Sequence, residues 1–179
     1  MAFKLLIIAS LFIFFATIPI FADLKINSQI NSLELSGQNG GLVSNEKPWT
    51  TDSLSKKTTV LFYIDPDFAE LNDHVSKALT DAKFPPKTLH SVAIINNAAT
   101  WIPNFAIRSR LEEKQKEFPN TVYALDLNKI LVNRWGLTDD SYVVLAINKV
   151  GNLMFNVSGK LTDQQVKQLI TLLKKDIAK

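Results

Sequence analysis

The run Thr59–Ile64 (Thr-Val-Leu-Phe-Tyr-Ile) is the feature that most constrains the fold. It is apolar on both faces of an extended chain, which is typical of a central strand covered on both sides of a sheet. Directly after it, Asp65 can cap a helix, Pro66 suits the first helical position, and Asp67 adds an acid to the first turn. The run therefore predicts a buried strand that leads straight into a helix.

The following segments repeat this alternation of strand and helix. Apolar residues recur at helical spacing after Asp65 (Phe68, Leu71, Val75, Ala78, Leu79 and Ala82) until Pro85 and Pro86 end the helix. Strands are predicted at 89–95 and 121–127, with a helix at about 104–117 between them. These connections require parallel strands and right-handed crossovers.

The last part of the chain changes pattern. Segments 142–147 and 153–157 alternate around a turn that contains Gly151, which predicts an antiparallel hairpin. In the final helix, Thr162 and Gln165 form a capping box. A closing hairpin and a helix after strand–helix–strand units predict an α/β fold, a thioredoxin-like three-layer sandwich. Short alternation around Leu24–Ile26 and Leu33–Leu35 adds an N-terminal strand extension, and 36–46 is predicted as a loop.

The first 22 residues have the pattern of a secretory signal peptide. Lys4 precedes an apolar stretch from Leu5 to Phe21, and Ala22 offers a small residue for cleavage. An uncleaved membrane anchor is the alternative, because the apolar stretch approaches spanning length. We therefore expect three parts: a signal peptide (1–22), N-terminal strands and a loop (23–57), and a thioredoxin-like domain (58–179). The expected location is the periplasm, with no stable membrane span after cleavage.

Composition excludes several kinds of chemistry. The chain has no cysteine, which excludes disulfide, thiolate and cysteine-based metal chemistry within it. The six glycines form no phosphate-binding loop, so we expect no nucleotide and no other cofactor. The formal charge is only +3 and no block of basic residues stands out, which argues against a nucleic-acid partner.

The mature part of the chain resembles the thioredoxin-like periplasmic YtfJ family of bacterial proteins. The resemblance spans about 75 to 173 and rests on diffuse stretches: Ala78–Phe84, Ile107–Ser109 with Leu111-Glu112, Leu125-Asp126, the segment around Trp135, and the hairpin running into Leu161–Val166. It implies an exported protein with a thioredoxin-like fold and no established role.

The chain departs from redox thioredoxins at both halves of their active site. Where those proteins carry Cys-x-x-Cys after the first central strand, this chain has Asp65-Pro66-Asp67-Phe68. Where they carry a cis-proline before the hairpin, it has Asp139-Asp140-Ser141-Tyr142. The sequence therefore predicts a protein that is not a thiol–disulfide oxidoreductase.

Asp65 and Asp67 also suggest an alternative function. A strand that ends in Asp-x-Asp is how haloacid-dehalogenase-type phosphatases present a nucleophile and a general acid beside Mg²⁺. The later acidic pair of such enzymes follows a strand, whereas Asp139-Asp140 precede one. Helix capping alone explains both Asp65 and Asp67, so a Mg²⁺-dependent phosphate-ester hydrolase is the second hypothesis.

Aromatic and arginine side chains give candidates for a binding site. Trp101 lies in a predicted loop, and Arg108 near a helix start, where a cation needs a partner: Glu112, Asp126 or a ligand. We select Trp101, Arg108, Asp126 and Trp135 as binding candidates, although a structural Arg–carboxylate pair with Trp135 in the core is the simpler explanation. His74 and His90 are too few for a zinc site without nearby acids, so no metal is expected.

These observations predict a non-redox binding or interaction module whose partner is an envelope protein or a small molecule. The competing hypotheses are the hydrolase that uses Asp65 and Asp67 and a purely structural or stress-related envelope protein. The latter predicts no ligand-dependent rise in melting temperature.

Overall fold

A computed structural model describes residues 23–179. The predicted signal peptide, 1–22, lies outside the described residues. The helices are α1 (Asp73–Asp81), α2 (Asn104–Glu117), α3 (Ile130–Trp135) and α4 (Asp163–Ile177). The strands are β1 (Glu34–Leu35), β2 (Gly40–Leu42), β3 (Trp49–Thr50), β4 (Thr58–Ile64), β5 (Leu89–Asn96), β6 (Thr121–Asp126), β7 (Tyr142–Ile147) and β8 (Leu153–Ser158).

The main sheet has the strand order β2-β6-β5-β4-β7-β8. Strands β4, β5 and β6 are mutually parallel, with Leu61 opposite Val92 and Ile94 opposite Ala124. The hairpin β7–β8 runs antiparallel to β4. The predicted parallel core and closing hairpin are therefore confirmed, with β4 in the interior of the sheet.

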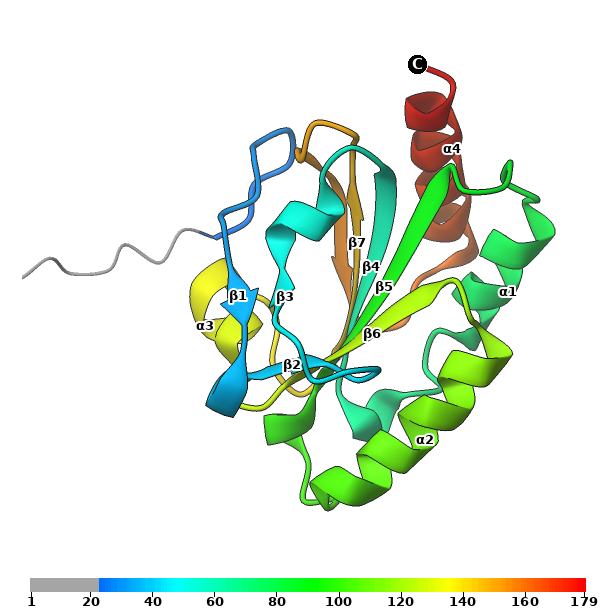
Figure 1. Cartoon of the computed structure of the whole chain (residues 1–179). Coiled ribbons are helices and arrows are strands. Elements are labelled where there is room, and N and C mark those ends of the chain that lie inside the picture. The colour runs from blue at the N-terminus through cyan, green and yellow to red at the C-terminus, as the bar shows by residue number, and fades with distance from the viewer. Residues whose placement is uncertain (1–22) are drawn as a thin grey trace, which may run out of the picture.

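The sheet is covered on both faces, which gives three layers (Figure 1). On one face α1, α2 and α4 contribute Val75, Ile107, Leu111 and Leu169 to one apolar cluster. On the other face Trp135 of α3 packs with Trp49 and other residues of the N-terminal segment. Within residues 23–179, the buried residues of both clusters come from positions 30–173.

One strand lies where the sequence predicted a loop. β2 falls within 36–46 and pairs antiparallel with β6, with Gly41 opposite Leu125. Gly40 has a φ of 121°, and a Cβ there would collide with the carbonyl oxygen of Leu125. Glycine is required because the two backbones approach so closely, which is why the composition of this strand looks like that of a loop.

The first long helix starts later than predicted. Asp65 does act as an N-cap, but of a short 3₁₀ turn, Pro66–Phe68, and α1 begins only at Asp73. Asn72 separates the two and is fully buried; its amide donates to Gly159 O and accepts from Leu161 N, both at 2.9 Å. These long-range bonds to the β8–α4 connection interrupt a helix that periodicity alone would continue.

The segment 23–57 is part of the same body as the rest of the chain. β1 pairs with β3 in a small second sheet, and residues 27–30 bond to the start of β8, with Asn27 N to Leu153 O at 2.8 Å. The predicted N-terminal extension thus packs on one face of the sandwich. Within residues 23–179 no helix has the length and apolar character needed to cross a membrane.

Candidate functional site

Polar side chains gather where the parallel strands end. Asp65 follows β4, Asn96 ends β5 and Asp126 ends β6, while Asp139 precedes the antiparallel β7. Parallel strands bring their carboxyl ends to one edge of a sheet, and ligands of open α/β sheets bind outside this edge. We call it the carboxyl edge; it lies at the bottom of Figure 1.

Asp65 lies directly after β4 and caps the short 3₁₀ turn Pro66–Phe68. Its side chain is buried, and Oδ1 accepts a hydrogen bond from Asp67 N at 2.9 Å. Burial raises the pKa of Asp65 above its ordinary value, and the nearby carboxylates of Asp67, Asp140 and Asp139 raise it further, against the backbone hydrogen bond. A buried carboxylate committed to a turn is poorly placed to attack a substrate.

Asp139 is held by two partners on opposite sides. Lys129 forms an ion pair with it, and Asn96 Nδ2 donates to its Oδ1 at 2.8 Å. Burial would raise the pKa of Asp139, but the hydrogen bonds from Lys129 and Asn96 outweigh this and lower it. The same hydrogen bond raises the pKa of Lys129, which also lies 3.8 Å from Asp140. Charges are therefore paired in the middle of this edge, while Asp140 remains largely exposed.

Asp126 performs a structural task at the same edge. It is fully buried and accepts hydrogen bonds from Ile130 N and Leu131 N at 2.9 Å, which satisfies the first amides of α3. Tyr63 OH donates to its Oδ2 at 3.1 Å, and burial together with this carboxylate raises the pKa of Tyr63. Asp126 is a buried helix cap, with no free face for a ligand.

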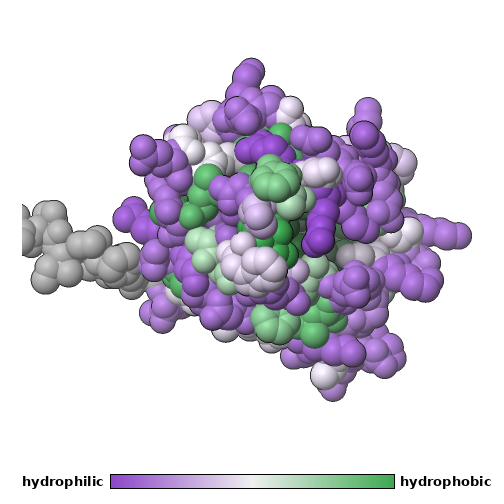
Figure 2. All heavy atoms as spheres, turned by 90° about the horizontal axis from the view of Figure 1, so that it is seen from below, coloured by the Kyte–Doolittle hydropathy of each residue, from purple (hydrophilic) through white to green (hydrophobic). Residues whose placement is uncertain are grey.

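Aromatic side chains stand exposed beside these carboxylates. Trp101 is 88% exposed, Phe105 77% and Phe68 41%. The loop that carries Trp101 is joined to the Asp65–Phe68 turn by Thr100 Oγ1, which donates to Asp67 Oδ1 at 3.3 Å. We call Phe68, Trp101 and Phe105 the aromatic patch. Figure 2 views this side of the molecule and shows apolar and near-neutral atoms in its middle, surrounded by hydrophilic ones.

The loop beneath the patch contains two unpaired buried atoms. Asn96 Oδ1 and Asn97 Oδ1 have no hydrogen-bond partner within residues 23–179, although the amide nitrogen of Asn97 donates to Asn104 Oδ1 at 2.6 Å. Buried acceptors without partners cost free energy.

The four binding candidates do not form one site. Only Trp101 is well exposed; Asp126 and Trp135 are buried, and Trp135 Nε1 donates to Asn31 O at 3.1 Å. Arg108 pairs with Glu46 at 3.5 Å. Neither Glu112 nor Asp126, the protein partners considered for Arg108, lies within ion-pair distance of it, because β2 and its following turn bring Glu46 to α2 instead. Trp101 belongs to the aromatic patch, because its neighbour Thr100 is hydrogen-bonded to Asp67, which precedes Phe68.

Sequence reasoning missed Phe68 and Phe105 as surface residues. Phe68 was assigned to the core stripe of a long helix, which its place in a 3₁₀ turn prevents. Phe105 follows Asn104 in the first turn of α2, and the core positions of that helix are Ile107 and Leu111. The sequence did indicate that Phe105 lies on the surface, because it falls outside the helical spacing of those two core positions.

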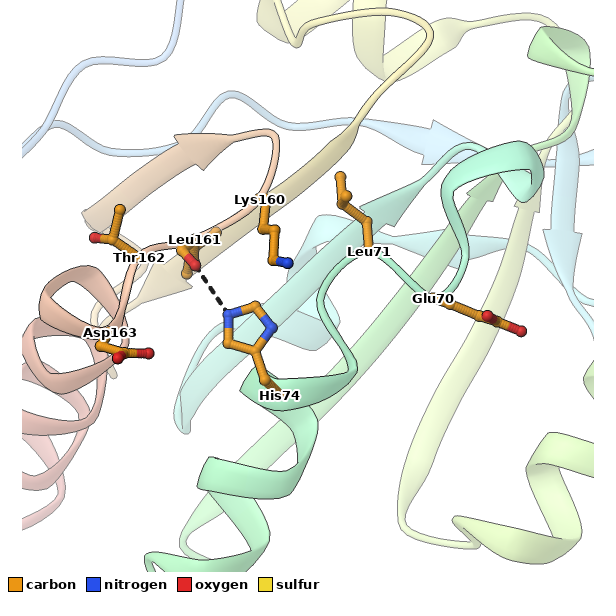
Figure 3. Close-up of a pocket in the computed structure, with 7 residues that line it drawn as sticks. All are labelled: Glu70, Leu71, His74, Lys160, Leu161, Thr162 and Asp163. Atoms are coloured by element: carbon orange, nitrogen blue, oxygen red, sulfur yellow. Dashed lines mark hydrogen bonds between the residues drawn. The ribbon is translucent and has the colours of Figure 1, made fainter.

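An open concavity lies between α1 and the β8–α4 connection. This open hollow of about 610 Å³ is lined by Glu70, Leu71, His74, Lys160, Leu161, Thr162 and Asp163 (Figure 3). His74 Nε2 lies 2.9 Å from Leu161 O, so this nitrogen carries the proton and donates. His74 thus joins α1 to the β8–α4 connection, which agrees with a structural role rather than a zinc ligand. Within residues 23–179 no group of three or more potential metal-ligating His, Asp or Glu side chains lies together.

Comparisons with known proteins agree with this geometry. A family profile described as "Bacterial protein of unknown function (YtfJ_HI0045)" matches residues 24–176. The uncharacterised protein YtfJ of Escherichia coli K12 is 29% identical over 133 residues, 72% of each chain, and an uncharacterised protein of Haemophilus influenzae is 23% identical over 159 residues, 84% of this chain and 86% of that one.

A solved structure shows the same fold. A putative thiol:disulfide interchange protein DsbE from Chlorobium tepidum superimposes with a TM-score of 0.62 at 11% identity, covering 87% of this chain and 99% of that one. The thioredoxin-like fold predicted from the sequence is therefore confirmed, on a chain that has no cysteine.

Proposed function

The chain belongs to the YtfJ family of bacterial proteins, and we propose that it is a non-redox binding protein that holds a partner polypeptide on its aromatic patch. We further propose that it does so in the periplasm, after removal of residues 1–22. The Chlorobium tepidum protein of the same fold is described as a putative thiol:disulfide interchange protein, and this chain cannot carry out such an exchange, because it has no cysteine.

The observation that carries the proposal is the exposure of Trp101 and Phe105. The two side chains are 88% and 77% exposed, so each leaves a large apolar area in contact with water. Aromatic residues are enriched in the central contacts of protein interfaces. They lie at the carboxyl edge of the parallel strands, where this class of fold forms its binding sites.

The charges around the patch indicate which partner fits it. Asp67 and Asp140 are exposed, while Asp65 is buried and Asp139 is half-buried. Lys129, the basic residue among them, is already paired with Asp139. A surface with apolar centre and acidic surroundings is complementary to a segment that combines apolar and basic side chains. We therefore propose a basic, partly apolar segment of an envelope protein as the occupant, in preference to a small molecule.

Crosslinking in cells tests the proposal. The full-length tagged protein is compared with Trp101→Ala/Phe105→Ala and with Phe118→Ala, and adducts are identified by mass spectrometry. Phe118 is the matched control because it is an exposed aromatic residue, 39% exposed, at the opposite end of α2. We expect one reproducible partner that the double variant loses and the control keeps, with a basic crosslinked segment. Equal adducts for all three proteins, or none, would refute the role of the patch.

The hydrolase that uses Asp65 and Asp67 stays a prediction with weaker support. Asp65 is 2% exposed, and its Oδ1 already accepts from the amide of Asp67. An assay of a generic phosphate ester with and without Mg²⁺ tests it directly. Activity that disappears in Asp65→Asn would establish the hydrolase and displace the binding-only proposal.

A further inference from the structure

The end of the sheet opposite the aromatic patch carries a different charge. β4 is seven residues long, which places its two ends about 20 Å apart. The amino end of β4, the β7–β8 turn and the carboxyl end of α4 meet at this far end. Two contacts show this: Thr58 Oγ1 donates to Asp176 Oδ2 at 2.8 Å, and Lys56 N donates to Lys149 O at 2.9 Å.

Lysines from separate parts of the sequence converge here. Lys149 Nζ donates to Ile177 O at 3.1 Å, which joins the turn to the last turn of α4. The same contacts bring together one group of side chains, which we call the lysine end: Lys25, Lys56, Lys57, Lys149, Lys174, Lys175 and Lys179. Lys25 lies at the border of this group: Asn27 N bonds to Leu153 O beyond the β7–β8 turn, while Leu24 N bonds to Trp135 O at the end of α3.

The positive charge of the lysine end is largely uncompensated. The carboxylate at its centre, Asp176, is 4% exposed and accepts from Thr58 and from Lys149 N. Its other oxygen lies 3.7 Å from Lys179. Within residues 23–179, Lys25, Lys56, Lys57, Lys174 and Lys175 have no carboxylate at ion-pair distance. In keeping with a positive local potential, burial and the charge of Lys57 both lower the pKa of His90.

Two exposed aliphatic side chains accompany these lysines. Val150, 68% exposed, stands at the β7–β8 turn directly after Lys149, and Ile26, 50% exposed, directly follows Lys25. The segments that carry them are hydrogen-bonded, with Ile30 N to Gly151 O at 3.1 Å. Exposed apolar side chains among lysines are the combination by which peripheral proteins bind an anionic lipid surface.

We propose that the lysine end docks on an anionic phospholipid membrane surface, with Ile26 and Val150 entering the headgroup region. The carboxylates at the other end of the sheet, Asp67 and Asp140 among them, are repelled by the same surface. The molecule is thereby oriented with its aromatic patch directed away from the lipid. This inference stands independently of what the patch binds.

Lipid is favoured over other polyanions because of the two aliphatic side chains. The phosphates of a nucleic acid would bind the lysines, but the side chains of Ile26 and Val150 would add no affinity for them. An acidic protein would require complementary pockets, whereas a bilayer accepts any exposed apolar side chain near its surface. The test therefore separates the contribution of charge from that of apolar contact.

Vesicle co-sedimentation of residues 23–179, which hold the whole described core, tests the proposal. The probes are vesicles of phosphatidylcholine with phosphatidylglycerol, vesicles of phosphatidylcholine alone, and duplex DNA as a lipid-free polyanion. The variants are Lys174→Gln/Lys175→Gln and Ile26→Ser/Val150→Ser. Lys160→Gln/Lys167→Gln is the matched control, since it makes the same charge change at the other end of α4, and circular dichroism establishes that each variant is folded.

We expect binding to the anionic vesicles that high salt abolishes. Loss of the lysine pair should weaken it roughly tenfold or more, because each lysine near such a surface contributes about a fivefold factor. The serine variant should weaken it severalfold, and the control should change it little. Absence of binding, equal effects of the control pair, or binding to DNA as strong as to vesicles with no effect of the serine variant would each overturn the proposal.

Discussion

The backbone amide of Asp65 donates a hydrogen bond to the carbonyl oxygen of Ser141, with 3.0 Å between nitrogen and oxygen. This bond joins the end of β4 to the loop before β7, the two places that form the active site in redox members of the fold. In this chain both places carry carboxylates. Within this chain, Asp65 at the end of β4 is buried, and Asp139 before β7 is paired with Lys129.

Asp65→Asn should stabilise the protein at neutral pH by about 1 kcal/mol. The amide oxygen of asparagine can still accept from Asp67 N, while the buried negative charge near Asp67, Asp139 and Asp140 is removed. Asp65→Ala should instead destabilise it by about 1 kcal/mol, because the cap is lost. Urea denaturation of the three proteins measures both, and a destabilised asparagine variant would contradict the electrostatic account.

The advantage of Asp65→Asn should depend on pH in a defined direction. The pKa of Asp65 is higher in the folded protein than in the unfolded chain, where it is about 4. The carboxyl group therefore contributes fully to the stability of the fold below pH 4, and this contribution is lost as the pH rises through the pKa of the folded state. The free-energy difference between the asparagine variant and the wild type should therefore grow from about pH 4 to about pH 7. A difference that stays constant across this range would show that the native pKa is not raised.

Asp126→Ala should be among the most damaging substitutions at this edge, costing about 3 kcal/mol. It leaves the hydroxyl of Tyr63 and the first amides of α3 without their acceptor in a buried place. Tyr63→Phe alone should cost about 1 kcal/mol. In a double-mutant cycle the two effects should not add, because both remove the same hydrogen bond. Additive losses would exclude coupling between the two side chains.

Gly40→Ala and Gly37→Ala should differ sharply, although both glycines have positive φ. A Cβ at Gly40 meets the backbone of Leu125, whereas a Cβ at Gly37 meets nothing within 4 Å. We expect about 1 kcal/mol of destabilisation at Gly37 and several kcal/mol at Gly40, with loss of the β2–β6 pairing. Thermal unfolding and amide exchange of β6 would show it; equal losses would mean that β2 is not held against β6.

Trp101→Ala/Phe105→Ala should leave stability within about 0.5 kcal/mol of the wild type. Both side chains are exposed, so neither contributes to the described core clusters. A loss of the crosslinked partner in this variant would therefore reflect binding rather than unfolding. A large fall in melting temperature would instead assign these side chains to the fold.

Much of the fold could be predicted because its signals are local. The apolar run of β4, the capping box of α4 and the turn between β7 and β8 each lie within a few residues, and the predicted bounds of α2 and β7 agree with the structure. The strands also alternate with helices in an order that few folds share.

The parts that could not be predicted depend on contacts between distant residues. β2 is a strand because its glycines fit against β6, and α1 is short because Asn72 bonds to the β8–α4 connection. α3 could not be predicted because it has only six residues and its start depends on other parts of the fold. Asp126, at the end of β6, accepts from Ile130 N, and Lys129 before the helix has a left-handed conformation.

The same limit applies to the surface. Phe68 fitted the spacing of a helix core, and only the interruption of that helix exposes it. The lysine end could not be predicted from the sequence, because its lysines are spread from Lys25 to Lys179 and come together only in the folded protein. A near-neutral chain can therefore carry two oppositely charged ends.

Site-specific photocrosslinking from position 101 tests the central claim most directly. A photoreactive phenylalanine analogue replaces Trp101 in one full-length variant and Phe118 in another, and adducts formed in cells are compared. The account predicts a discrete adduct with a basic, partly apolar polypeptide segment from position 101 and none from position 118. No adduct from position 101, or the same adducts from both positions, would contradict it.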